Sequence, residues 1–128
     1  MASSKQVIVW DSVTLQLAAG HVTVQTHRIT LPQGTIGWRL TNGASTPTNT
    51  IEVASNLTTI TSTGGALPGI YPTTVPGGQA LELNVSSLEV YVRNRNNATP
   101  FVNIVWWRAD RQGSPGPGAA TVSANLTP

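Results

Sequence analysis

The sequence predicts an all-β fold: a single-domain antiparallel β-sandwich of jelly-roll-like type, followed by an extended C-terminal tail. The composition favours strands and turns over helices, because Thr, Ser, Asn, Gly and Val dominate and Lys5 is the only lysine. Nine strand-like runs follow one another, at residues 6–10, 13–17, 21–31, 35–41, 50–54, 57–61, 80–85, 89–95 and 101–107. Turn-forming residues separate many of these runs, and many short strands at regular spacing indicate a sandwich or a barrel.

In the first half of the chain, the run at 21–31 is the most irregular. Its apolar residues change phase near His27 and Arg28, which indicates a bulge or a strand that crosses from one sheet to the other. A turn at residues 32–34 then reverses the chain into a run in which Trp38 shares one face with other apolar residues. Trp38 is therefore predicted to lie in the core.

The last three strands show the clearest alternation. In the first two, every second residue is apolar and belongs to the predicted core face: Leu81, Leu83, Val85, Leu88, Val90 and Val92. The strand at 101–107 is apolar on both faces, with Val102, Ile104 and Trp106 on one and Phe101, Val105 and Trp107 on the other. A small domain has little to cover both faces, so we predict that further copies of the chain cover the second one, in a homo-oligomer that we expect to be a trimer.

The opposite face of the strand at 89–95 is polar and carries one aromatic ring and two arginines. Tyr and Arg are enriched in protein interfaces, because they combine contact area with directional hydrogen bonds. We therefore assign six residues to the oligomer interface: Phe101, Val105, Trp107, Tyr91, Arg93 and Arg95. The same tyrosine and arginines also resemble a stacking surface for single-stranded nucleic acid. Nucleic acid is the less favoured partner, because the net charge of +2 comes from a few scattered arginines.

The remaining tryptophans divide into two groups. Trp106, like Trp38, shares a face with apolar neighbours and is assigned to the core. Trp10 and Trp107 are open to two interpretations, because an exposed indole serves either a protein interface or a platform on which a sugar stacks.

No arrangement of residues indicates catalysis. His21 and His27, with Asp11 and Asp110, lack the spacings of a nucleophile motif or a metal site, and we interpret both histidines as surface or rim residues of a strand. Cysteine is absent, which excludes disulfides and thiolate metal ligands. The strand carboxylates are expected to be solvated: Glu52, Glu82 and Glu89. We therefore predict a protein without enzymatic activity, bound metal or cofactor.

A long loop at residues 61–78 is rich in Gly, Pro and Thr and contains an apolar pair, Ile70 and Tyr71. A loop of this length in a small domain is usually functional, often because it lies on another molecule. Flanking prolines favour an extended form of the pair that can dock at low entropic cost. We therefore predict that Ile70 and Tyr71 contact a partner protein.

The chain is predicted to divide into a β-sandwich domain at 1–111 and a tail at 112–128. The first part of the tail is rich in Gly and Pro, and we expect it to act as an extended linker that prevents the tail from folding back into the sheets. Val122 and Leu126 are its apolar anchors, and they gain little unless another chain buries them.

Composition also bears on where the protein acts. Only 9% of the residues are charged, against about 25% in an ordinary soluble domain, which suggests that part of the surface faces another protein. No apolar run approaches the ~20 residues of a membrane-spanning helix, so no membrane is expected as a partner. The apolar stretch at 7–10 is too short for a signal peptide, which predicts synthesis in a cytoplasm without export by that route.

Three segments, at 74–85, 88–95 and 101–106, contain a Pro-Gly-Gly turn followed by a strand, the sequence VYVRN and an apolar strand. Together they resemble the closing strands of small all-β virion proteins of tailed bacteriophages. The resemblance is to capsid decoration (cement) proteins and related head or tail domains. It implies a homotrimer on the capsid surface of a virion, made in the host cytoplasm, whose arms and loops clamp the major capsid protein. The resemblance itself assigns no binding residue. From the loop and the tail described above, four residues are assigned to shell binding: Ile70, Tyr71, Val122 and Leu126.

The sequence thus predicts a non-enzymatic viral structural protein that oligomerises and binds and stabilises a capsid shell. Two alternatives remain. One is a carbohydrate-binding adhesin or receptor-binding module of a virion that uses exposed Trp and Tyr rings. The other is a small coat protein that contacts packaged nucleic acid through its arginines.

Overall fold

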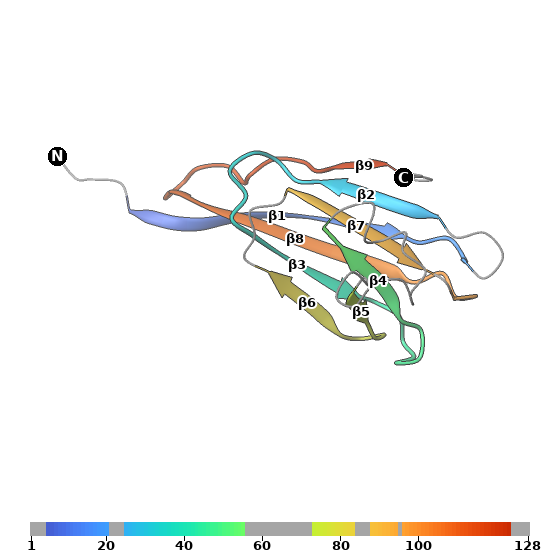
Figure 1. Ribbon diagram of the computed structural model, residues 1–128. Coiled ribbons are helices and arrows are strands. Elements are labelled where there is room, and N and C mark those ends of the chain that lie inside the picture. Colours follow the sequence, from blue (N-terminus) through green and yellow to red (C-terminus); the bar gives the residue numbers. More distant parts are fainter. Residues whose placement is uncertain (1–4, 21–24, 56–72, 84–87, 95, 124–128) are drawn as a thin grey trace.

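The computed structural model describes residues 5–20, 25–55, 73–83, 88–94 and 96–123. Within these ranges the chain forms nine strands and no helix, and the strands build two antiparallel sheets (Figure 1). The predicted all-β class is confirmed. The jelly-roll arrangement stays a prediction.

The first sheet, sheet A, contains the two longest strands. In spatial order its members are β1 (Gln6–Gln16), β8 (Phe101–Arg111), β3 (Gly37–Asn42) and β6 (Ala80–Leu83). The runs predicted at 6–10 and 13–17 form one continuous strand, because Asp11 and Ser12 stay in the ladder opposite β8. β8 continues past the predicted end at Trp107 for the same reason, since β1 pairs with it over its whole length.

The second sheet, sheet B, is built from five shorter strands. In spatial order they are β5 (Thr73–Val75), β4 (Ile51–Ala54), β7 (Glu89–Asn94), β2 (Thr26–Thr30) and β9 (Thr121–Ser123). β2 pairs with β7 without interruption from Thr26 to Thr30, so there is no bulge at His27 in the described part of this strand.

The core lies between the two sheets. Alternate residues of β3 and β8 meet alternate residues of β2, β4 and β7, and the largest buried side chains are Trp38 and Trp106. These two tryptophans are opposite each other in the ladder between β3 and β8. The assignment of both to the core is confirmed.

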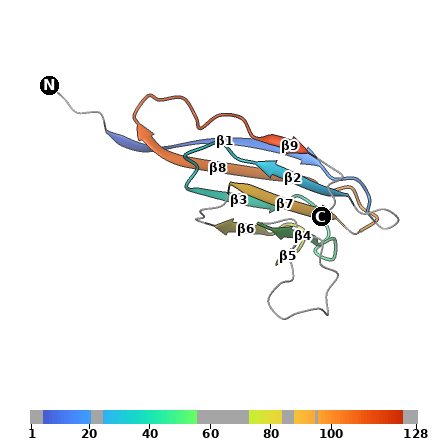
Figure 2. The same ribbon diagram turned by 45° about the horizontal axis from the view of Figure 1, so that its top comes forward.

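The segment after Arg111 returns to the sandwich, contrary to the prediction of a separate tail. In both views the chain turns back along the sandwich after β8 before it reaches β9 (Figure 1, Figure 2). The backbone N–H of Gly118 donates to Asp11 Oδ2 at 2.8 Å, and Trp106 Nε1 donates to the Gly118 carbonyl at 3.0 Å. Because Asp11 and Trp106 face each other in the sheet A ladder, they hold one residue of the linker by both of its backbone groups.

β9 then pairs with β2 at the edge of sheet B, with Val122 opposite Ile29. The expectation that the Gly/Pro linker prevents a return to the sheets is therefore wrong. Gly118 has a φ of 110°, which an L side chain rarely adopts, and this freedom lets the chain turn towards β2. Several predicted features lie outside the described residues: the strand at 57–61, Ile70, Tyr71, Arg95 and Leu126.

Candidate interaction face

The outer face of sheet A exposes large apolar side chains. Alternation along β1 directs Ile8 and Trp10 away from the core, and these side chains are 57% and 62% exposed. Alternation along β8 directs Phe101, Val105 and Trp107 to the same side, as the sequence predicts. The exposure of the Trp10 indole beside Ile8 indicates an interaction surface, because soluble monomers rarely leave neighbouring large apolar side chains in water.

A shallow groove of about 340 Å³ crosses this face and is lined by Ile8, Trp10, Arg39, Val105 and Trp107. We call these five residues the tryptophan face. The ladders explain why they meet: Trp10 is opposite Trp107 across β1 and β8, and Arg39 is opposite Val105 across β8 and β3.

Gly37 allows the Trp107 indole to lie against the backbone of β3. A Cβ atom at position 37 would be 2.7 Å from the ring carbons Cε2 and Cζ2, so only glycine leaves room for the ring in this position. One side of Trp107 is thus covered by its own sheet, and the indole is half-buried. The groove therefore has one fixed aromatic wall, Trp107, and one that extends into solvent, Trp10.

The tryptophan face carries one positive charge, and its neighbouring strand carries one negative charge. Arg39 is exposed on β3, and Glu82 lies opposite it on β6. Arg39 forms no ion pair within the part of the chain that the structure describes. Both charges are therefore available to another molecule.

Phe101 is on the same face but does not line the groove. It lies six residues from Trp107 along β8, a separation of about 20 Å at ~3.3 Å per strand residue. The Phe101 ring is 56% exposed at the end of the sheet, opposite Gln16. The outer face of sheet A thus has two separate exposed features, the tryptophan face and the Phe101 end.

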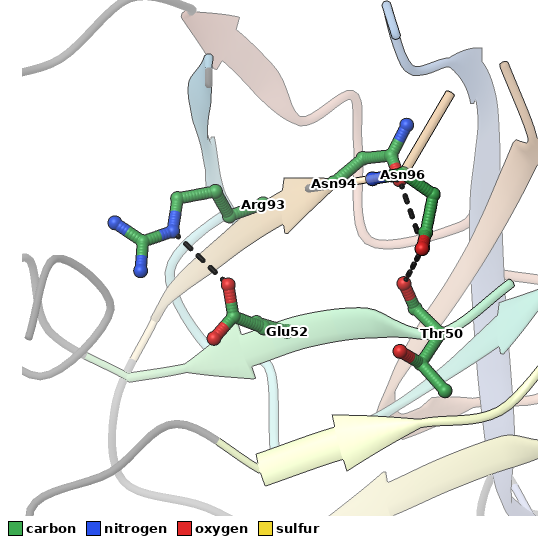
Figure 3. Close-up of polar contacts among 5 residues, drawn as sticks. All are labelled: Thr50, Glu52, Arg93, Asn94 and Asn96. Carbon is green, nitrogen blue, oxygen red and sulfur yellow. Dashed lines mark hydrogen bonds and ion pairs between the residues drawn. The ribbon is translucent and has the colours of Figure 1, made fainter. Parts of the chain in front are cut away.

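Tyr91 and Arg93 do not join this face. They belong to β7 in sheet B, and each is only 5% exposed. Arg93 Nε donates to Glu52 Oε1 at 3.2 Å, between β7 and β4 (Figure 3). Neither side chain is available to a second subunit, so their assignment to one interface with Phe101, Val105 and Trp107 is wrong. Because Tyr91 and Arg93 are buried, they also cannot form a stacking surface for nucleic acid. Glu52 is hydrogen-bonded to Arg93 and its side chain is only 19% exposed, so it is not the solvated carboxylate that the sequence suggested.

The Tyr91 hydroxyl donates to Glu89 on its own strand. Burial raises the pKa of Tyr91, and the hydrogen bond to the Glu89 carboxylate adds to the rise. The tyrosine is thus held as a neutral donor in sheet B.

His27 faces the core instead of the surface. It shares a side of β2 with Ile29 and is 8% exposed, and its Nδ1 has no hydrogen-bond partner among the described residues. Burial lowers its pKa, because charging the ring in this position would cost solvation. The interpretation of His27 as a surface or rim residue is wrong, while His21 lies outside the described residues.

Among the residues that the structure describes, no three His, Asp or Glu side chains are close enough together to hold a metal ion. Within the same residues no helix has the length and apolar character needed to cross a lipid bilayer. Comparison of the chain with models of known protein families and with curated proteins finds no match.

Sequence reasoning missed Ile8 and Arg39 as members of the candidate site and left Trp10 open. The signal was present, because Ile8 and Trp10 occupy alternate positions of one strand and so share a face. Alternation within the run at 6–10 does not say which of its two sides faces the core. Only the register of β1 against β8 brings Trp10 to Trp107.

Proposed function

We propose that this chain is a non-enzymatic structural protein that associates with further copies of itself through the tryptophan face, and that the resulting oligomer decorates a viral capsid shell. The observation that carries the proposal is the exposure of Trp10 and Ile8 beside Trp107 on the outer face of sheet A.

The energetic reason is the apolar area that this face leaves in water. Complete burial of one large apolar side chain contributes ~1.5–3 kcal/mol, and a tryptophan offers about 150–250 Å² for burial. Trp10 is a suitable anchor, because exposed Trp residues near the centre of a patch commonly carry much of the binding energy of an interface.

A second copy fits this face in charge as well as in polarity. Arg39 and Glu82 are neighbours across two strands, so the face of one copy offers each charge a partner on the other. A charge-poor chain, with 9% charged residues, has few other groups that oppose such contact. The resemblance to decoration proteins implies that three copies associate, and the trimer stays part of the proposal.

The outer face of sheet A is small for a protein interface. The two 11-residue strands β1 and β8, with the shorter β3 and β6, cover about 500 Å² in projection at ~3.3 Å per residue and ~4.8 Å per strand, before side-chain relief is added. A standard interface buries about 800 Å² on each partner. The interface proposed on the tryptophan face is therefore smaller than the standard size, and it relies on Trp10 as its anchor.

Shell binding is supported by the resemblance and by one further feature. Val122 on β9 is 41% exposed at the edge of sheet B and does not line the groove of the tryptophan face, so it is free to contact a shell subunit while that face is occupied. Ile70, Tyr71 and Leu126 remain proposed shell contacts, because they are the apolar residues of the loop and tail segments that the sequence assigns to shell binding.

Co-sedimentation with empty shells, assembled from the major capsid protein encoded by the same genome, tests shell binding. We expect the intact chain to sediment with the shells and Trp10→Ala to bind more weakly, because a monomer loses the gain from several simultaneous contacts. Phe101→Ala is the matched control, since it removes a similarly exposed aromatic ring on the same sheet outside the groove. Absence of the intact chain from the shell pellet would contradict the decoration role.

A further inference from the structure

A second hollow is lined by residues at the end of the sandwich where β3 ends and β8 begins. Figure 1 shows the two strands whose ends meet there. The volume of the hollow is about 230 Å³, and it shares no lining residue with the tryptophan face. Two loops and the start of β8 form its wall: Gly43, Ala44, Ser45, Asn49, Ala98, Thr99, Pro100 and Phe101. We call it the loop-end hollow.

A fully buried asparagine fixes the first loop of the hollow. Asn42 Nδ2 donates to the carbonyls of Asn49 at 2.8 Å and Val75 at 2.9 Å, and its Oδ1 accepts from the Ala44 N–H at 3.0 Å. Every polar atom of this buried amide is thus used to hold the loop between β3 and β4.

Asn94 fixes the second loop in the same way. Its Nδ2 donates to the carbonyls of Ala18 at 2.9 Å and Ala98 at 2.8 Å, and its Oδ1 accepts from the Asn96 N–H at 3.0 Å. The Asn96 side chain in turn donates to the Thr50 carbonyl, which ties this loop to the start of β4 (Figure 3).

The first loop is also joined to the start of β8. The Gly43 N–H donates to the Phe101 carbonyl at 2.8 Å, and a Cβ atom at position 43 would be 2.6 Å from that oxygen. Glycine is therefore required for this close approach. The hollow is pre-organised by buried amides, which reduces the entropy that a ligand must remove on binding.

The chemistry of the wall is neutral and polar beside one aromatic ring. No lining residue is charged. The Ser45 and Asn49 side chains form no hydrogen bond with any described residue, and the Thr99 hydroxyl accepts from Gln16 Nε2 and keeps its own hydrogen to donate. The Phe101 ring stands exposed at the rim.

We propose that the loop-end hollow binds a neutral sugar residue, with one face of the pyranose ring on Phe101 and its hydroxyls hydrogen-bonded to Ser45, Asn49 and Thr99. The apolar C–H face of a pyranose suits a phenyl ring, and its hydroxyls both donate and accept, as these side chains do. The volume is below the range of about 300–1,000 Å³ for drug-sized ligands, which fits one terminal residue of a glycan.

Anionic ligands and extended peptides fit the hollow less well. An anion would lack a cationic partner, since the wall has none. An extended peptide would need free backbone groups to pair with, but the N–H groups of Gly43, Ala44 and Asn49 are already bonded within the protein. A neutral sugar needs only the free side chains.

Titration of the ¹⁵N-labelled chain with neutral methyl glycosides of glucose, galactose, mannose and N-acetylglucosamine, followed by NMR, tests the proposal. At about 10 mM, enough to saturate a site with a dissociation constant near 1 mM, we expect one of them to shift amide signals at residues 43–49 and 98–101. Phe101→Ala and Asn49→Ala should each weaken binding by at least about tenfold, and Trp10→Ala should leave it unchanged.

Two results would overturn the sugar site: no shift with any of the four glycosides, or shifts centred on Trp10 and Trp107. Asn49→Ala keeps the backbone carbonyl that Asn42 uses, so its fold is expected to persist and its loss of binding is informative. The Phe101→Ala variant should no longer bind the sugar but should still self-associate. The Trp10→Ala variant should still bind the sugar but should no longer self-associate. Failure of the sugar site is therefore distinguishable from failure of the self-association proposal.

Discussion

At the scale of single residues, the buried His27 makes the stability of the fold depend on pH. Its Nδ1 is buried with no hydrogen-bond partner in the part of the chain that the structure describes, and burial lowers its pKa from the ordinary value of 6.5. The unfolded chain therefore binds more protons than the folded chain below pH 6.5. The free energy of unfolding is unaffected by this residue above pH 6.5 and falls as the pH drops below that value.

We expect chemical denaturation at pH 7.5 and pH 5.0 to show this loss, at a slope of no more than about 1.4 kcal/mol per pH unit. His27→Leu should remove much of the difference between the two pH values, because leucine does not titrate. His21→Gln is the control, since it removes the only other histidine and leaves His27 in place. An equal pH dependence in His27→Leu and in the natural sequence would show that other groups cause it.

Other single residues show what local pattern can and cannot reveal. Alternation correctly placed Trp38 and Trp106 in the core and Trp107 on the opposite side of β8. It also placed Arg93 on the opposite side of β7 from Val92, but the period of two says nothing about whether that side is covered. Arg93 is buried and paired with Glu52, and these residues are 41 positions apart in the sequence.

At the scale of secondary-structure elements, β9 and the linker before it depart most from the sequence-based expectation. Gly and Pro residues at 113–118 are typical of a free linker, and nothing nearby indicates an anchor. The anchor comes from Asp11, which is 107 positions away from Gly118. Most strands were predictable because alternation is local, whereas sheet order, register and this return of the chain depend on contacts distant in sequence.

Because β9 belongs to sheet B, truncation after Arg111 should destabilise the fold. It removes the Gly118 carbonyl and leaves the buried Trp106 Nε1 without its protein partner, which costs about 1–3 kcal/mol in addition to the lost pairing with β2. Urea denaturation should measure this decrease in the free energy of unfolding. A chain that ends at Ser123 keeps β9 and is the matched control. Equal stability of the chain truncated after Arg111 and the intact chain would show that the segment is a dispensable tail.

At the scale of the whole molecule, the two sheets differ in what they present to solvent. Sheet A exposes the tryptophan face and the Phe101 end, while Tyr91 and Arg93 of sheet B are buried. The sequence predicted an apolar outer face on 101–107, and this part of the candidate site is present. The contribution of Ile8, Trp10 and Arg39 required the pairing of β1, β8 and β3, which no single segment of sequence specifies.

Sedimentation velocity of the purified chain at micromolar concentration tests self-association through the tryptophan face most directly. We expect the natural sequence to sediment as an oligomer of 13.4 kDa subunits, Phe101→Ala to keep that size, and Trp10→Ala to sediment as a folded monomer. Circular dichroism with the same samples would show that each variant keeps its strands. A monomer formed by the natural sequence, or an oligomer that Trp10→Ala leaves intact, would contradict the proposal.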